Sequence, residues 1–210
     1  MTRIAVILLA AGRSTRFSPT GAHKLLAPIR GIPVVRLSAQ AAVDAGVGDV
    51  VVVTGAEATA IVAALGQLPV RAVHADDFAS GMSASVRRGV EAIRANVQAV
   101  MIALADQPMM RAEYYRTVVA TWRTTGAPIV TPMYASSTGP AHPTLFAATV
   151  FDELVDVRGD TGARSVIARD PTRVAVLPID APVPRDIDTP EDLAEVEAAL
   201  VAQEITGESR

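Results

Sequence analysis

Cysteine is absent from the 210-residue chain, which excludes disulfides, thiolate catalysis and zinc or iron–sulfur sites with cysteine ligands. Aromatic residues make up only 4% of the chain while 50% of it is hydrophobic, so the core must consist mostly of Ala, Val, Leu and Ile. No apolar run approaches the roughly 20 residues that a membrane span requires. The first apolar run leads straight into a polar loop, unlike a signal peptide. We therefore expect a cytoplasmic protein with no membrane partner.

A strong excess of one charge is also missing. The chain carries 19 Lys and Arg against 22 Asp and Glu, a formal net charge of −3. This balance offers no general attraction for nucleic acid, so we expect no nucleic-acid partner. The length suits one large domain. We assign residues 1–203 to it and residues 204–210 to a frayed polar tail.

Apolar runs alternate with helical patterns along the chain. Buried strands are expected at 4–9, 50–53, 70–73, 99–104, 129–131, 143–146 and 174–177. Helices are expected at 33–45, 58–65, 84–94, 111–122, 149–155, 163–168 and from 190, with Ser83 and Thr189 as N-caps and a flexible insertion at 133–141. The order predicts a single α/β domain, doubly wound, with a mostly parallel sheet and helices on both faces. Ligands of such folds bind at the carboxyl ends of the strands.

The loop after the first strand combines small residues with cations. It begins with Ala10, Ala11 and Gly12, and it carries Arg13, Arg16 and Lys24. Small residues let a ligand approach the backbone, and loop N–H groups with fixed cations suit phosphates. The Gly-x-Gly-x-x-Gly and P-loop patterns are both missing. The loop therefore predicts a triphosphate site outside those two common motifs.

Carboxylates are expected on the same rim. Asp106 follows the 99–104 strand, where it is either a turn residue or a metal ligand. Mg²⁺ usually takes one or two carboxylates together with substrate phosphates and waters. Asp186 and Asp188 precede Thr189, and the DIDTPED pattern is also good helix-start chemistry. Either of these two aspartates is a candidate second ligand.

Two further segments precede helices. In the stretches 81–85 and 159–164, the backbone N–H groups at the helix start either bind an anion or are merely capped by a side chain. His23 and His74 are most simply structural or surface residues, whereas His142, between a flexible loop and Pro143, is a candidate for the site.

Six segments taken together resemble the MobA-like nucleotidyltransferases, and among them the molybdenum cofactor cytidylyltransferases. They are LAAGRSTRF and KLL within 9–26, ASGMSASVRRG at 79–89, LADQP at 104–108, AHPTLF at 141–146, GDTGAR at 159–164 and DIDTPEDL at 186–193. The resemblance implies a Rossmann variant like that of nucleotide-diphospho-sugar transferases. It also implies transfer of CMP from CTP, or of a nucleotide from another NTP, to molybdopterin or its molybdenum-loaded form. Pyrophosphate would leave, and a molybdoenzyme would receive the product.

The same resemblance implies roles for individual residues. The nucleotide would be held by Leu9, Ala10, Ala11, Gly12, Arg13, Arg16 and Lys24, with Arg16, Lys24 and Asp106 catalytic. Asp106 and Asp188 would hold Mg²⁺. The pterin acceptor would face Gly81, Met82, Ser83, Ser85, His142, Gly159, Asp160 and Arg164. Ala10 and Ala11 stand where guanylyl-specific relatives usually show paired glycines, which indicates a pyrimidine base.

Three departures from the family pattern accompany these matches. The loop between Arg16 and Lys24 is longer than usual, His23 replaces an asparagine, and Pro140 replaces an arginine. Three alternatives therefore stand beside the leading hypothesis: nucleotidyl transfer to another phosphate acceptor, an NAD(P)H-dependent reductase, and a non-catalytic cofactor carrier on the same fold.

Overall fold

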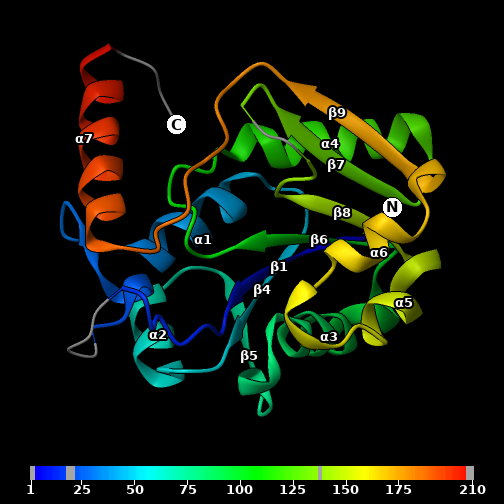
Figure 1. The fold of residues 1–210 in the computed structure, drawn as a ribbon, viewed down its shortest axis with the longest axis horizontal. Helices are drawn as coiled ribbons and strands as arrows, with labels where there is room; N and C mark the ends of the chain where they lie inside the picture. Colours follow the sequence, from blue (N-terminus) through cyan, green and yellow to red (C-terminus); the bar gives the residue numbers. More distant parts are fainter. Residues whose placement is uncertain (1–2, 18–21, 137–138, 207–210) are drawn as a thin grey trace.

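The computed structural model describes residues 3–17, 22–136 and 139–206 (Figure 1). A seven-stranded sheet in the order β5-β4-β1-β6-β8-β7-β9 forms its centre. In that order the strands are Val70–His74, Asp49–Thr54, Ile4–Ala10, Ala99–Leu104, Thr144–Ala147, Ile129–Tyr134 and Val174–Ile179. All neighbouring pairs are parallel except those of β8, which runs antiparallel to β6 and β7. The expected mostly parallel sheet is confirmed.

Helices cover both faces of this sheet. Every residue of β1 is buried, and its alternation sends Val6 and Leu8 to one face and Ala5 and Ile7 to the other. The first face packs against α1 (Val34–Asp44), α2 (Ala58–Leu65), α4 (Ala112–Thr125) and α7 (Pro190–Thr206). The second packs against α3 (Met82–Ile93), α5 (Phe151–Val155) and α6 (Arg164–Arg169). The doubly wound architecture therefore follows from strands that are apolar on both sides.

Short elements complete the fold. Six 3₁₀ turns lie within the described residues, at Lys24–Leu26, Phe78–Ser80, Arg94–Asn96, Ala148–Val150, Gly159–Thr161 and Pro171–Arg173. A separate two-stranded ribbon joins β2 (Pro28–Ile29) to β3 (Ile32–Pro33). Its two turn residues, Arg30 and Gly31, both have positive φ (52° and 80°), as a type I′ hairpin requires. None of the helices described is long and apolar enough to cross a membrane.

The expected start of α3 is wrong. The N-cap is Gly81, with φ 114°, and Ser83 lies inside the first turn, where its hydroxyl is buried and caps nothing. A Cβ on residue 81 would come within 2.6 Å of the Gly159 carbonyl oxygen, so only glycine lets this turn pack so closely.

Other boundaries differ less. Met133 and Tyr134 belong to β7 rather than to a flexible insertion, and residues 137–138 of that insertion lie outside the described residues. Helix α7 continues to Thr206, past residue 204 where a tail is expected, and residues 207–210 lie outside the described part.

The sheet brings three chain segments to one edge. Strands β1 and β6 are neighbours with Leu9 opposite Leu104, so the loops that follow them start side by side. Ile187 is fully buried in the core, and its N–H donates to the Asp106 carbonyl oxygen at 2.9 Å. The segment before α7 is thereby attached to the end of β6. Asp186 and Asp188 flank this anchor and have different partners: Asp186 contacts Gln107, and Asp188 contacts Lys24.

Candidate active site

A cavity of about 970 Å³ lies at the carboxyl ends of β1 and β6. It is lined by all the residues expected to hold the nucleotide: Leu9, Ala10, Ala11, Gly12, Arg13, Arg16 and Lys24. A Cβ on Gly12 would meet nothing within 4 Å, so the packing of the protein does not require this glycine. The open space beside it faces the cavity, as close approach of a ligand to the backbone would need.

His23 shapes the loop on the far side of residues 18–21. The backbone N–H of Leu25 can only donate, so His23 Nδ1 accepts its hydrogen bond (3.3 Å). Nε2 therefore carries the hydrogen that it donates to the Gly12 carbonyl oxygen at 2.9 Å. The Lys24 N–H donates to Ser14 Oγ at 3.2 Å. These bonds tie the two ends of the cationic loop together, and they confirm His23 as a structural residue.

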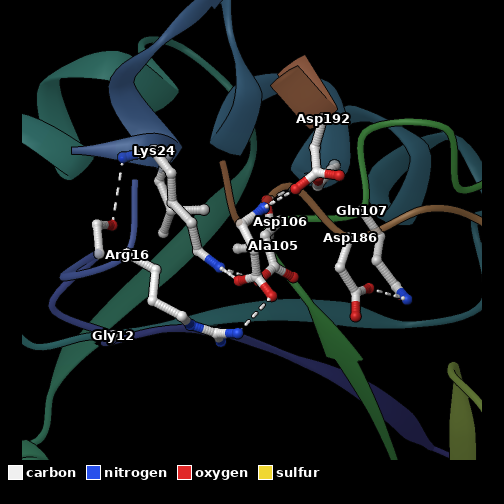
Figure 2. A network of polar contacts seen from close by, with 12 residues as sticks. Gly12, Arg16, Lys24, Ala105, Asp106, Gln107, Asp186 and Asp192 are labelled. Atoms are coloured by element: carbon white, nitrogen blue, oxygen red, sulfur yellow. Dashed lines mark hydrogen bonds and ion pairs between the residues drawn. The ribbon is translucent and has the colours of Figure 1, made fainter. Parts of the chain in front are cut away.

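Two basic side chains converge on two carboxylates (Figure 2). Lys24 Nζ lies 2.6 Å from Asp106 Oδ2 and 2.9 Å from Asp188 Oδ1. Arg16 reaches the other oxygen of Asp188 at 3.1 Å. Burial by itself lowers the pKa of Lys24, but Asp106 and then Asp188 outweigh it, so the pKa is raised and the ammonium stays charged. The site thus holds a compact set of alternating charges.

One carboxylate oxygen in this set has no partner. Asp106 Oδ1 is buried and accepts no hydrogen bond from any described residue. An orphan carboxylate oxygen is costly unless something else ligates it. The described residues contain no group of three His, Asp or Glu that could hold a metal by themselves. Two carboxylates completed by phosphates and waters are the usual magnesium arrangement, so Asp106 and Asp188 fit this ion.

Asp186 is held differently from Asp188. Gln107 Nε2 donates to Asp186 Oδ1 at 2.7 Å, and burial, followed by the charge of Asp106, raises the pKa of Asp186. Sequence patterns had not singled out Gln107 as a functional residue, although it directly follows Asp106. Of the two candidate second ligands, Asp188 is the one that, like Asp106, accepts a hydrogen bond from Lys24 Nζ.

The start of α7 orients Asp188. Asp192 Oδ2 accepts hydrogen bonds from the N–H groups of Asp188 (3.1 Å) and Thr189 (2.9 Å). In return the Asp192 N–H donates to Thr189 Oγ1 at 3.2 Å, which completes a reciprocal capping box. Thr189 is confirmed as the N-cap, and Asp192 has the helix-start role expected from its position.

The lining of the same cavity also contains most of the residues expected to face the acceptor. Gly81, Met82, Ser85, His142, Asp160 and Arg164 line the cavity, whereas Ser83 and Gly159 do not. The Ile102 carbonyl can only accept, so His142 Nδ1 carries a hydrogen and donates it at 3.1 Å. Burial, with a smaller contribution from the charge of Arg164, lowers the pKa of His142. A neutral His142 therefore stands beside a cationic arginine.

Arg13 lies apart from the cation cluster. Its guanidinium sits 5.6 Å from the centre of the Phe78 ring, as in a cation–π contact. Phe78 also lines the cavity, although no sequence motif marks it as a functional residue. The distance between residues 13 and 78 along the chain hides such a contact from any local pattern.

Residues 6–174 match the MobA-like NTP transferase domain. The chain belongs to this family. It is therefore a nucleotidyltransferase by family and fold, as the resemblance in its motifs implied.

Curated relatives of this MobA-like chain have different names. It is 30% identical over 194 residues to nicotine blue oxidoreductase of Paenarthrobacter nicotinovorans, covering 89% of this chain and 93% of that one. It is also 30% identical over 204 residues to the purine catabolism protein PucB of Bacillus subtilis (strain 168), covering 92% and 96%. Family membership thus spans proteins with more than one named role.

Solved structures confirm the fold. Rv0371c of Mycobacterium tuberculosis H37Rv superimposes with a TM-score of 0.83 at 29% identity, covering 94% of this chain and 98% of that one. A complex of Rv0371C with manganese aligns with a TM-score of 0.79 at 28% identity, covering 94% and 100%. A CMP:2-keto-3-deoxy-manno-octonic acid synthetase complexed with CTP aligns with a TM-score of 0.74 over 97% and 100% of the two chains, but at 16% identity it supports the fold alone.

Proposed function

We propose that the protein transfers CMP from CTP to the terminal phosphate of molybdopterin or its molybdenum-loaded form. The observation that carries the proposal is the convergence of Arg16, Lys24, Asp106 and Asp188 on one wall of a cavity. Arg164 and His142 line the same cavity. A donor triphosphate and an anionic acceptor would each meet a cation there. The product would pass to a molybdoenzyme.

The proposed reaction needs little covalent chemistry from the protein. An oxygen of the acceptor phosphate forms a bond to the α-phosphorus of CTP. The bond from that phosphorus to the oxygen bridging to the β-phosphate breaks, and its electron pair leaves with pyrophosphate. A phosphate monoester has lost most of its second proton at neutral pH, so its attack requires no general base. This agrees with a site whose histidine is buried and neutral.

The residues of the chain would act by position and charge. Lys24 and Arg16 would turn from the carboxylates to the phosphate oxygens and stabilise the charge that develops on pyrophosphate. Asp106 and Asp188 would hold Mg²⁺, which when bound offsets the negative charge of the triphosphate. Arg164 would orient the acceptor phosphate for in-line attack.

The base is assigned from the loop after β1. Ala10 and Ala11 are 1% and 6% exposed, and both line the cavity. Their methyl groups narrow the space beside the backbone relative to paired glycines. The smaller pyrimidine ring therefore suits this loop better than a purine.

A pyrophosphate-release assay tests the proposal. Purified protein, Mg²⁺ and reduced molybdopterin are incubated with each of the four common NTPs in turn. We expect release with CTP, and its collapse in Asp106→Ala. Asp76→Asn, a change at an almost fully exposed carboxylate, serves as the control and keeps full activity. No release with any NTP would overturn the assignment.

A second candidate rests on one relative. Nicotine blue oxidoreductase is 30% identical to this chain in an alignment that covers 93% of that relative. The competing function is therefore reduction of a dye or small heteroaromatic compound with NAD(P)H. This chain lacks a Gly-x-Gly-x-x-Gly loop for an ordinary dinucleotide. Oxidation of NADH by the purified protein without added metal would favour this alternative. Tight binding of finished cofactor with no turnover would instead indicate a carrier.

A further inference from the structure

Ser38 is a polar residue on the buried face of α1, with only 1% of its surface exposed. Its hydroxyl donates to the Ala105 carbonyl oxygen at 2.8 Å. The Val34 carbonyl oxygen, one turn earlier in the helix, lies farther away at 3.3 Å. A serine inside a helix often bonds back to that preceding turn. Here the shorter bond leaves the helix and reaches the residue immediately before Asp106.

The backbone around Asp106 is held from three directions. The Ala105 N–H donates to the Leu9 carbonyl oxygen of β1 at 3.1 Å. The Asp106 carbonyl oxygen accepts from the Ile187 N–H, in the segment before α7, at 2.9 Å. The carbonyl between these two bonds belongs to Ala105, and its partner is the Ser38 hydroxyl of α1. Ser38 therefore completes the set of bonds that fixes this end of β6.

The bond from Ser38 also affects where the Asp106 carboxylate points. The Ala105 carbonyl and the Asp106 N–H belong to one planar peptide group, so fixing the carbonyl fixes the bond that leads to the aspartate. Oδ2 of this aspartate lies 2.6 Å from Lys24 Nζ, and Oδ1 is buried without a partner (Figure 2). Without the hydroxyl, the buried Ala105 carbonyl would lose its partner, which is costly, and the peptide would turn to find another.

Helix α1 is bonded to the Lys24 turn as well. The Val34 N–H, at the start of the helix, donates to the Ala27 carbonyl oxygen at 3.1 Å. The Ala27 N–H in turn lies 3.3 Å from the Lys24 carbonyl oxygen. One helix thus contacts the backbone on both sides of the ion pair between Lys24 and Asp106. Ser38 provides the contact on the carboxylate side.

We propose that Ser38 is a positioning residue for Asp106. Its hydroxyl orients the 105–106 peptide so that the carboxylate faces Lys24 and the divalent metal. Ser38 acts through the backbone, since it does not line the active-site cavity. This inference rests on the proposed function, in which Asp106 holds Mg²⁺.

Two pairs of variants isolate the hydroxyl. Ser38→Ala removes it from the unchanged chain. Ser38→Val and Ser38→Thr have the same shape and differ by the hydroxyl, so any strain from the extra methyl group in a packed core is common to both. A conclusion drawn from the second pair therefore holds even where Ser38→Ala is too unstable to study.

Mn²⁺ affinity in the presence of CTP is the first measurement, made by the electron paramagnetic resonance of free Mn²⁺. We expect Ser38→Ala to bind about tenfold more weakly than the unchanged chain, and Ser38→Val about tenfold more weakly than Ser38→Thr. Thr54→Val is the control, because it removes another buried hydroxyl, which donates to the Val73 carbonyl oxygen at 3.3 Å. It should lower the melting temperature and leave Mn²⁺ affinity unchanged. If Ser38→Ala behaves in the same way, Ser38 is merely structural and the proposal is wrong.

A second measurement needs neither metal nor nucleotide. Lys24 is the only lysine, so its rate of reductive methylation, followed by peptide mass spectrometry, reports on its ion pair with Asp106. Asp106→Asn gives the rate without that pair. We expect Ser38→Ala and Ser38→Val to react faster than the unchanged chain and Ser38→Thr, toward the rate of Asp106→Asn. Equal rates with and without the hydroxyl would overturn the positioning of the carboxylate.

The two measurements separate this inference from the proposed reaction. If the unchanged chain binds no Mn²⁺ with CTP, the metal role of Asp106 fails, and the methylation rates still decide whether Ser38 orients the carboxylate. If Mn²⁺ binding depends on the hydroxyl but no NTP releases pyrophosphate, the proposed reaction fails and the positioning role of Ser38 stands.

Discussion

Lys24 Nζ lies 2.6 Å from Asp106 Oδ2, although 82 positions separate the two residues. The same ammonium bonds Asp188 at 2.9 Å, 164 positions away. One cation thus bridges the two carboxylates that we propose as ligands of a divalent metal. We expect that a divalent metal, when it binds the two carboxylates, releases Lys24 from them. The ammonium can then bind the triphosphate.

Loss of the Lys24 charge should abolish most of the activity. Lys24→Met keeps a chain of similar length without the ammonium, and we expect CTP-dependent pyrophosphate release to fall by about 100- to 1000-fold. Arg16→Met should cost less, because the Arg16 side chain is 76% exposed and its charge is better screened. Arg123→Met, at an exposed position on α4, is the control. Equal losses for Lys24 and Arg16 would contradict this ranking.

Lys24 is the only lysine in the chain, so its pKa is directly measurable. Reductive methylation with ¹³C-formaldehyde gives one lysine signal beside that of the terminal amine. In metal-free protein we expect the pKa of the labelled Lys24 to lie above that of the same labelled residue in the unfolded chain. In Asp106→Asn, which removes the largest raising influence, we expect a lower pKa. A signal that titrates identically in both proteins would refute the role of Asp106.

The sign of the linked stability effect follows from this shift. A raised folded-state pKa means that the charged Lys24 stabilises the fold below its unfolded-state pKa. That stabilisation disappears as the pH rises through the folded-state pKa. The gap in thermal unfolding temperature between the unchanged chain and Asp106→Asn should therefore be larger at neutral pH than at strongly alkaline pH.

Metal affinity should separate the two candidate aspartates. With CTP present, Asp188→Asn should weaken Mn²⁺ binding by at least about tenfold, measured by the electron paramagnetic resonance of free Mn²⁺. Asp186→Asn should change it less, because Gln107 rather than Lys24 holds Asp186. A greater loss for Asp186→Asn would reverse the assignment of the second ligand.

The capping box before α7 should contribute measurable stability. Thr189→Ala removes the acceptor of the Asp192 N–H, and we expect a loss of about 1 kcal/mol in the free energy of urea unfolding. Thr189→Ser should retain most of it. Thr121→Ala, whose hydroxyl donates to a carbonyl within α4, is the matched control without a cap. Equal losses at positions 189 and 121 would argue against a specific cap.

Much of the fold follows from local patterns. The all-apolar strand at 4–10 needs cover on both faces wherever it lies, so a doubly wound sheet was predictable. The helix at 58–65 has the predicted bounds because Gly66 ends it with a φ of 60°. The N-cap of α3 was predicted wrongly because it depends on the packing of Gly81 against Gly159, a contact with no local signal.

The sequence by itself determined which chemistry the protein carries: cations on a glycine loop, and carboxylates at strand ends. Only the tertiary structure decided which of these groups meet. Strand order and the buried Ile187 place Asp188 beside Lys24 and direct Asp186 to Gln107. The bond from Ser38 to the Ala105 carbonyl oxygen likewise exists only once α1 packs against the end of β6. Contacts between distant segments depend on the packing of the whole sheet, and no spacing along the chain encodes them.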